Sequence, residues 1–134
     1  AGEVLVVVAL PAAAPEPAPH AIREKTEAMK RALNEWVAHR RYVLNDQTID
    51  DIAADLGFDR FFFAWYFTHE LHTTFRTWRT ELRIKEAQRL LSEEDIAVAS
   101  LHLKVGISDK SNFYKHFKAH TGMTPTEYKK SAQK

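Results

Sequence analysis

Apolar residues recur at helical spacing through most of the chain after residue 21, and no stretch gives a convincing strand. In the first such stretch, at about 22–40, Ala28, Leu33, Trp36 and Val37 share one stripe while most charged residues lie off it. The same kind of pattern, with its turn and capping residues, predicts further helices at about 49–56, 60–70, 75–91, 96–104, 109–120 and from Pro125 to Tyr128. The sequence therefore predicts an all-α fold of about seven helices.

Two segments of the chain, 52–78 and 101–128, repeat one local plan. Residues 56–59 match residues 105–108 at an offset of 49, and beyond one inserted residue the offset becomes 50. At that second offset the aromatic residues Phe63, Phe67 and Trp78 fall on Phe113, Phe117 and Tyr128. Each copy consists of a short helix, a glycine turn, a capping Asp or Ser, and a second helix. This is the pattern of a helix-turn-helix, which offers its second helix to the major groove of DNA.

The repeat sets the expected organisation of the 134 residues. We expect a first helix-turn-helix subdomain at about 46–72, a long linker helix at about 75–91 and a second subdomain at about 95–121. Residues 21–134 would then form one DNA-binding domain. Residues 1–20 read as a tail and linker, because residues 11–19 hold four prolines and no core-forming side chain.

The first ten residues, AGEVLVVVAL, leave their origin open. They fit the stub of a membrane helix, a strand of a missing domain, or a remnant added in cloning. The chain does not begin with Met, so we expect a fragment of a longer protein.

Charge is distributed unevenly although the net charge is only +1. Residues 1–59 carry −4, residues 60–103 balance, and residues 104–134 carry +5. A basic segment on a near-neutral chain is the electrostatic footprint expected of a nucleic-acid binder. The absence of cysteine excludes disulfides and thiolate chemistry and agrees with a reducing cytoplasm, where we expect the protein to act. A membrane-tethered full-length protein stays open as an alternative.

The chain offers no catalytic constellation. His69 with His72, and His116 with His120, have spacings that could hold a metal, but no third ligand completes either set. Four glycines and no glycine-rich loop argue against a nucleotide-phosphate cradle. We therefore expect no enzyme activity, no metal and no cofactor.

Residues 106–128, GISDKSNFYKHFKAHTGMTPTEY, closely resemble the C-terminal signature of the AraC/XylS family of bacterial transcription regulators, GFSDxSxFxxxFKxxxGxTPxxY. Residues 78–91 are similar to the family's linker helix, LRIxxAxxLL, and the resemblance extends over roughly residues 28–130. It implies two helix-turn-helix subdomains whose recognition helices enter successive major grooves, about 34 Å apart. It also implies sequence-specific promoter binding that positions or recruits RNA polymerase, and a sensor or dimerisation domain elsewhere in the protein. An activator is expected, and repression stays open as the alternative.

The resemblance assigns DNA contacts to the second recognition helix. Lys110, Ser111, Asn112 and Lys115 occupy its base-facing positions. Lysine can donate to guanine O6 and N7, and asparagine can pair with adenine N6 and N7. For phosphate contacts we expect Ser108, His116 and Lys118 around the second unit, with Arg60 and Arg83 elsewhere.

The first recognition helix departs from the family, because its residues 60–69, RFFFAWYFTH, include six aromatic side chains. Phe61, Ala64 and Trp65 stand at its groove-facing positions, which are commonly polar or basic. An exposed Phe61 and Trp65 could read thymine methyls, pack on a partner or a missing domain, or mark a helix that no longer reads DNA. Only Arg60 helps this helix to reach phosphate, which favours the latter two. A helical module that binds protein is therefore the alternative function.

Two substitutions inside the repeat also need an account. His72 stands where the second copy has Gly122, and His102 stands where the first copy has the small Ala53. We expect the buried imidazole of His102 to require a polar partner or a rearrangement.

Overall fold

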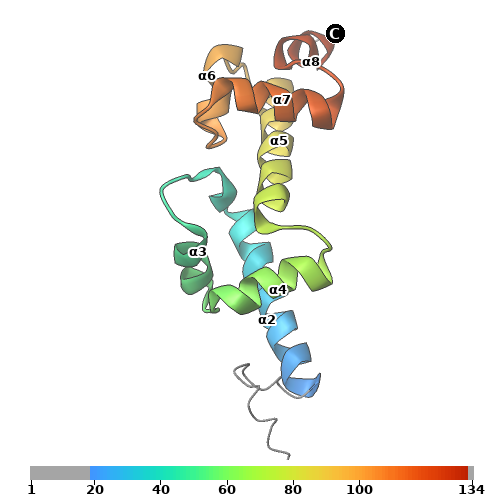
Figure 1. Cartoon of the computed structure of the whole chain (residues 1–134). Coiled ribbons are helices and arrows are strands. Elements are labelled where there is room, and N and C mark those ends of the chain that lie inside the picture. The colour runs from blue at the N-terminus through green and yellow to red at the C-terminus, as the bar shows by residue number, and fades with distance from the viewer. Residues whose placement is uncertain (1–18, 133–134) are drawn as a thin grey trace, which may run out of the picture.

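The computed structural model describes residues 19–132, which form seven α-helices and one 3₁₀ turn without any strand (Figure 1). The elements are α2 (Pro19–Ala38), η3 (Arg41–Val43), α3 (Ile49–Leu56), α4 (Arg60–Glu70), α5 (Phe75–Glu93), α6 (Val98–Lys104), α7 (Lys110–Thr121) and α8 (Pro125–Ala132). The predicted all-α class is confirmed. The linker predicted at 1–20 lies outside the described residues, except for Pro19 and His20, which begin α2. Within residues 19–132 no helix combines the length and apolar character that crossing a bilayer demands.

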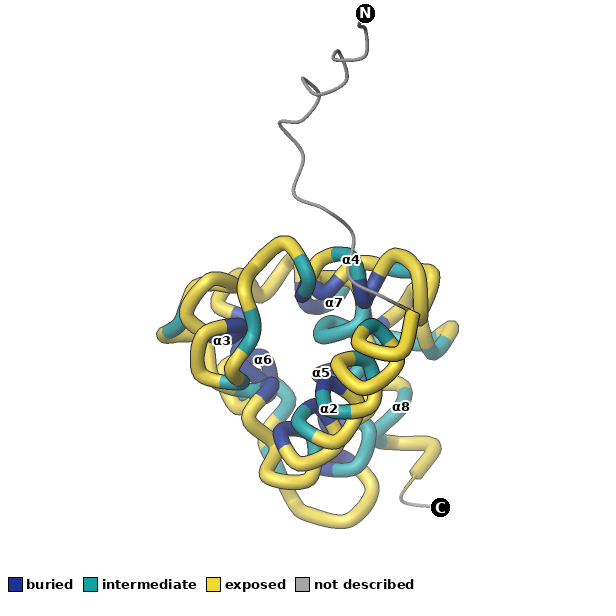
Figure 2. The backbone as a smooth tube through the Cα atoms, turned by 90° about the horizontal axis from the view of Figure 1, so that it is seen from below, coloured by how far each residue is buried: buried dark blue, intermediate teal, exposed yellow. Residues whose placement is uncertain are grey.

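The buried side chains form two separate cores that share the long helix α5. The first core lies among α2, α3, α4 and the start of α5, and consists of Met29, Leu33, Trp36, Tyr42, Ile52, Ala53, Phe63, Tyr66, Phe67 and Phe75. The second lies among the rest of α5, α6 and α7, and consists of Ile84, Ala87, Leu90, Leu91, Leu101, Val105, Ile107, Phe113 and Phe117. In Figure 2, buried backbone segments line the inside of the helices that surround α5. The predicted linker helix is therefore a structural member of both subdomains.

The first core is built mostly from aromatic rings. Trp36 stacks on Trp78 at 5.9 Å between ring centroids, and Phe67 lies 5.0 Å from Trp78. Met29 is fully buried beneath them, although the sequence pattern had placed Ala28 on the stripe instead. Ile49, predicted to be buried with Ile52 and Ala53, is 40% exposed because it occupies the first position of α3.

The two helix-turn-helix units share their turn geometry. Gly57 and Gly106 adopt left-handed φ values of 90° and 85°. Asp59 then caps α4 by accepting a hydrogen bond from the Phe62 amide at 2.9 Å, and Asp109 caps α7 through the Asn112 amide at 3.0 Å. The bond from Phe62 is the main cause that lowers the pKa of the Asp59 carboxyl. Since the second cap is Asp109, the extra residue of the second copy is Ser108, which had been matched to Asp59.

The two histidine substitutions are accommodated differently. His72 takes a left-handed φ of 53° where Gly122 has 80°, so the first copy keeps the turn without a glycine. His102 is buried, and its Nδ1 lies 2.9 Å from the carbonyl oxygen of Ile107. The predicted polar partner of this imidazole is therefore a carbonyl of its own turn.

The two subdomains meet at η3. The buried Arg83 of α5 donates from Nε to the Tyr42 carbonyl at 2.6 Å and from Nη2 to the Leu44 carbonyl at 2.8 Å. Gly106 packs so closely on Val43 that an added Cβ would overlap the Val43 carbonyl oxygen. The turn of the second unit thus rests on backbone of the first.

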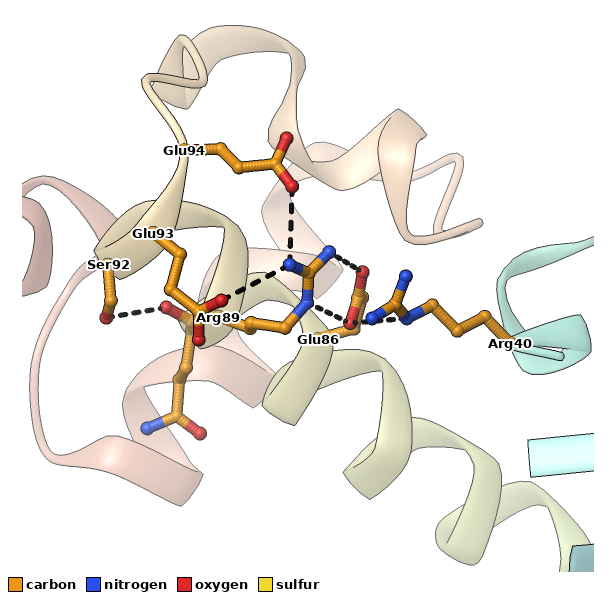
Figure 3. Close-up of polar contacts among 7 residues, drawn as sticks. Arg40, Glu86, Arg89, Ser92, Glu93 and Glu94 are labelled. Atoms are coloured by element: carbon orange, nitrogen blue, oxygen red, sulfur yellow. Dashed lines mark hydrogen bonds and ion pairs between the residues drawn. The ribbon is translucent and has the colours of Figure 1, made fainter. Parts of the chain in front are cut away.

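A carboxylate network reinforces this junction (Figure 3). Glu86 of α5 is 8% exposed and accepts from Arg89 Nη2 at 2.8 Å, while Arg40 Nε lies 3.6 Å from it. Arg40, which precedes η3, adopts a left-handed φ of 54°. The Arg89–Glu86 bond lies within α5, so within this network only the ion pair between Arg40 and Glu86 connects the linker helix to the residues before η3.

Candidate nucleic-acid interface

The two predicted recognition helices, α4 and α7, lie on the same side of the molecule. In Figure 1 α7 crosses the upper part of α5 and α4 crosses α2 part-way along its length, and in the perpendicular view of Figure 2 both project onto the same edge. Helices α3 and α6, the first helices of the two units, likewise share one side in Figure 2. This arrangement presents both second helices to one extended surface.

The second recognition helix, α7, is amphipathic. Phe113 and Phe117 are fully buried and anchor it to the second core. Four predicted base-contacting residues are exposed on it: Lys110, Ser111, Asn112 and Lys115. None of its lysines is ion-paired with a carboxylate in the part of the chain that the structure describes.

Three predicted phosphate-contacting residues lie on this helix or just before it. Ser108 is exposed in the turn immediately before the capping Asp109, and Lys118 is exposed near the end of α7. His116 is half-buried and faces the cleft between the two units. The structure thus brings Ser108, Lys118 and the base-facing set onto one helix and its preceding turn.

The first recognition helix, α4, exposes less aromatic surface than its sequence indicates. Phe63, Tyr66 and Phe67 are buried, and Phe61 is 76% exposed. The prediction of an exposed Trp65 is wrong, because this ring is half-buried. Trp65 stacks along its own helix, 5.5 Å from Phe62 and 4.8 Å from His69 between ring centroids.

Three side chains remain exposed on the groove-facing side of α4, and two of them are apolar. They are Phe61, Ala64 and, one turn further on, Thr68. Arg60, the predicted phosphate contact of this helix, is exposed, but its Nη1 lies 3.3 Å from Asp50. Its guanidinium also lies 5.3 Å from the centre of the Phe61 ring. The Asp50 carboxylate therefore competes with a DNA phosphate for the guanidinium of Arg60.

The phosphate role predicted for Arg83 is contradicted by its position. The side chain is 8% exposed and donates to two backbone carbonyls of residues 42 and 44. Burial, and secondarily the charge of Arg79, lowers the pKa of Arg83 to about 10. Its role is to satisfy the carbonyls at the junction of the two subdomains.

Sequence analysis missed a cleft between the two units. It has a volume of about 680 Å³. Its walls are formed by Gln47, Thr48, Ile49, Asp50, Phe75, Arg76, Thr77, Arg79, Thr80, Arg83, Ile107, Asn112, His116 and His120. The available signal was the spacing of Arg76, Arg79 and Arg83, which places all three on one face of a helix. Within residues 19–132, no group of three or more His, Asp or Glu side chains is arranged to hold a metal ion.

Comparison with known proteins identifies relatives of this fold and sequence. Residues 63–131 match the family model of a helix-turn-helix domain. The chain is 29% identical over 86 residues to the melibiose operon regulatory protein of Escherichia coli K12, across 64% of this chain and 28% of that protein. The chain therefore spans less than a third of the length of this relative.

Two solved structures have the same arrangement of helices. A transcriptional regulator from Chromobacterium violaceum, described as having an AraC-type DNA-binding domain, superposes with a TM-score of 0.67 and 24% identity, over 79% of this chain and 96% of that one. The DNA-binding domain of the transcriptional factor AdpA, solved in complex with a target DNA, gives a TM-score of 0.66 and 23% identity, over 76% and 93%. These similarities establish the fold.

Proposed function

The chain belongs to the helix-turn-helix family as an AraC-type DNA-binding domain of a transcription regulator, and on that premise we propose that it reads promoter DNA with α4 and α7 in successive major grooves. The observation that carries this proposal is the placement of two equivalently capped second helices on one side of the molecule. Half-sites one helical turn apart, about 34 Å, present successive major grooves on one face of the duplex. A single chain would then read a direct repeat.

The second helix, α7, is the main reader of bases in this proposal. Lys110, Ser111, Asn112 and Lys115 are exposed and supply donors and acceptors that match the polar edges of guanine and adenine. Ser108, His116 and Lys118 would position the helix on the backbone. The +5 charge of residues 104–134 supports this division, because phosphate affinity follows the density of positive charge.

The first helix, α4, would read by apolar contact. Phe61 and Ala64 are exposed and chemically suited to the methyl group of thymine. The stack of Trp65 on Phe62 and His69 makes it a support for this surface, and its predicted base contact remains a proposal for the part of the side chain that is exposed. Arg60 would contribute phosphate affinity once its contact with Asp50 is exchanged.

The alternative, that α4 binds a protein partner, rested on the exposure of both Phe61 and Trp65. It is weakened because Trp65 is half-buried. A partner surface needs a contiguous apolar patch, and on α4 only Phe61 among the large hydrophobic residues is strongly exposed. Single exposed hydrophobic side chains are normal on soluble proteins. The apolar positions of α4 fit a narrow base contact better than a protein interface.

For the whole protein, we infer that a sensor or dimerisation domain lies outside this chain and that the regulator positions RNA polymerase in the cytoplasm. The support is the length of the melibiose regulator, of which this chain spans 28%. The absence of cysteine agrees with that compartment.

The experiment that tests the proposal is selection of bound sites from a random duplex pool at fixed, near-physiological salt. Two enriched half-sites one helical turn apart are the expected result. A single half-site would mean that α7 specifies and α4 does not. Absence of both enrichment and salt dependence would contradict the proposal and favour the protein-binding alternative.

A further inference from the structure

The cleft between the two units carries positive charge that the fold itself does not use. Arg76 and Arg79 lie on the wall formed by α5, and neither forms an ion pair with any carboxylate of residues 19–132. Arg40, Arg60 and Arg89 are paired with carboxylates, whereas Arg23, Arg31 and Arg41 are not paired within the described residues. Arg76 and Arg79 are therefore distinguished by sharing the wall of one cleft between the two units. Two arginine side chains without a carboxylate partner, gathered at one site, are well suited to bind an anion such as a phosphate.

The two arginines are close enough to influence each other. The pKa of Arg79 is lowered, mainly by burial and also by the charge of Arg76. The guanidinium of Arg79 lies 5.2 Å from the centre of the Phe75 ring, which holds it in the cleft. A partly buried Arg79 beside an exposed Arg76 favours a bound anion, because an anion offsets the repulsion between the two charges and the desolvation of Arg79.

The opposite wall of the cleft belongs to the second recognition helix. Asn112, His116 and His120 line it from α7, facing the arginines of α5. These side chains can donate hydrogen bonds to an anion. The one carboxylate in the lining, Asp50, lies 3.3 Å from Arg60, so its charge is offset within the fold.

We propose that this cleft, through Arg76 and Arg79, grips the DNA backbone where it passes between the two major grooves. The occupant is the phosphodiester of the duplex itself, because α4 and α7 lie on the same side and the cleft lies between their units. The inference rests on the proposed mode of DNA binding. It adds a contact that is independent of base sequence and that couples the two half-sites through the linker helix.

The geometry also sets the spacing of the site. A contact between the half-sites is made only when the duplex spans both grooves at the distance fixed by α5. Insertion of base pairs between the half-sites should therefore remove the cleft contact and one half-site contact together. The cleft would enforce the one-turn spacing.

The test uses the whole chain, with Arg79→Gln and Arg76→Gln compared against Lys85→Gln. Lys85 is exposed on the same helix and does not line the cleft, so it is a matched control for loss of one charge. Glutamine keeps part of the aliphatic stem and removes the charge, including the guanidinium of Arg79 that lies over the Phe75 ring. Thermal unfolding followed by circular dichroism should confirm that all three variants remain folded.

Affinity is measured by fluorescence anisotropy on a selected duplex and on a random one, over a range of salt. Each cleft variant should lower the slope of log K against log salt by about 0.9 and weaken binding at about 0.1 M salt by roughly eightfold, equally on both duplexes. Lys85→Gln should change neither quantity by a comparable amount. Equal effects from the cleft variants and the control would overturn the proposal.

Position along the DNA is tested with single methylphosphonate linkages, which neutralise one phosphate at a time. The wild-type chain should lose affinity at linkages between the half-sites, and Arg79→Gln should show no further loss there. If the variant loses as much as the wild type, other residues hold those phosphates and the cleft assignment fails. If the wild-type chain binds no duplex at all, the proposed function fails instead.

Discussion

The first and second helix-turn-helix units share one backbone and present different chemistry on it. Both turns carry a left-handed glycine, and both second helices begin at a capping aspartate. Yet α4 has the exposed Phe61 and Ala64 where α7 has the exposed Ser111 and the half-buried Tyr114. The buried positions and caps are thus conserved between the units, while the groove-facing positions diverge. Readout can change at Phe61 and Ser111 with little cost to the fold, because both side chains are exposed, whereas Trp65 and Tyr114 pack against the edges of the two cores.

The two turns differ in what surrounds them. A Cβ on Gly57 would meet nothing within 4 Å, whereas one on Gly106 would overlap Val43. The first turn faces open space and the second is the contact between the subdomains. The same glycine therefore serves backbone conformation in one unit, and both conformation and close packing in the other.

The largest difference in stability between the two units should come from substitution of these glycines. Gly106→Ala should lower the free energy of unfolding by about 2–5 kcal/mol, from left-handed strain together with overpacking. Gly57→Ala should cost only the strain, about 1–2 kcal/mol, and Gly122→Ala should match it because its surroundings are equally open. Urea denaturation followed by circular dichroism measures all three. Equal losses at Gly57 and Gly106 would contradict the close contact.

The next effect concerns the arginine that supports the junction. Arg83→Met keeps the apolar stem but leaves the Tyr42 and Leu44 carbonyls without their donors, which should cost about 2–4 kcal/mol of unfolding free energy. Lys85→Met, exposed on the same helix, is the control and should change stability by less than about 0.5 kcal/mol. A variant at Arg83 with unchanged stability and weaker DNA binding would restore the phosphate role that we reject.

Base reading by α7 should show in the ratio of specific to random binding. Asn112→Ala and Lys115→Ala should each reduce discrimination by about 1–3 kcal/mol. Lys118→Ala should weaken binding to specific and random duplexes alike and lower the salt slope by about 1. Quantitative titration at several salt concentrations distinguishes the two classes. Uniform losses for all three variants would overturn the assignment of roles.

The smallest effect tests whether α4 reads thymine methyls. Replacing thymine by deoxyuridine removes only the methyl group, so each contacted position should lose about 0.8 kcal/mol, or roughly fourfold in affinity. We expect this loss in the half-site of α4 and not in that of α7. Phe61→Ala should abolish it. If the wild-type chain binds the thymine and deoxyuridine duplexes with equal affinity, α4 contributes no apolar readout.

Much of the fold could be predicted because its signals are local. The Gly57 and Gly106 turns, the Asp59 cap and the helical periods all depend on residues a few positions apart. The exact cap of α7 was missed by one residue, because Ser108 and Asp109 are both good caps and only the tertiary packing of the turn selects between them.

The candidate site was predicted less completely. The exposed set on α7 followed from its periodicity and from the family resemblance. Trp65 did not, because its ring lies along the helix and stacks on Phe62 and His69 rather than pointing outward. A helical wheel gives the direction of a Cβ and not the path of a large ring.

The sequence by itself determined the helices, their order, the doubled helix-turn-helix and its family, since each of these depends on short-range periodicity, capping and a contiguous motif. Only the tertiary structure decided which arginines are available to DNA. Arg76, Arg79 and Arg83 all line the cleft, but the guanidinium of Arg83 is bound by carbonyls 41 and 39 residues away, while Arg76 and Arg79 form no ion pair within residues 19–132. The physical reason is that the availability of a guanidinium for DNA depends on whether other groups of the protein already bind it. Those groups are distant in the sequence and come together only on folding.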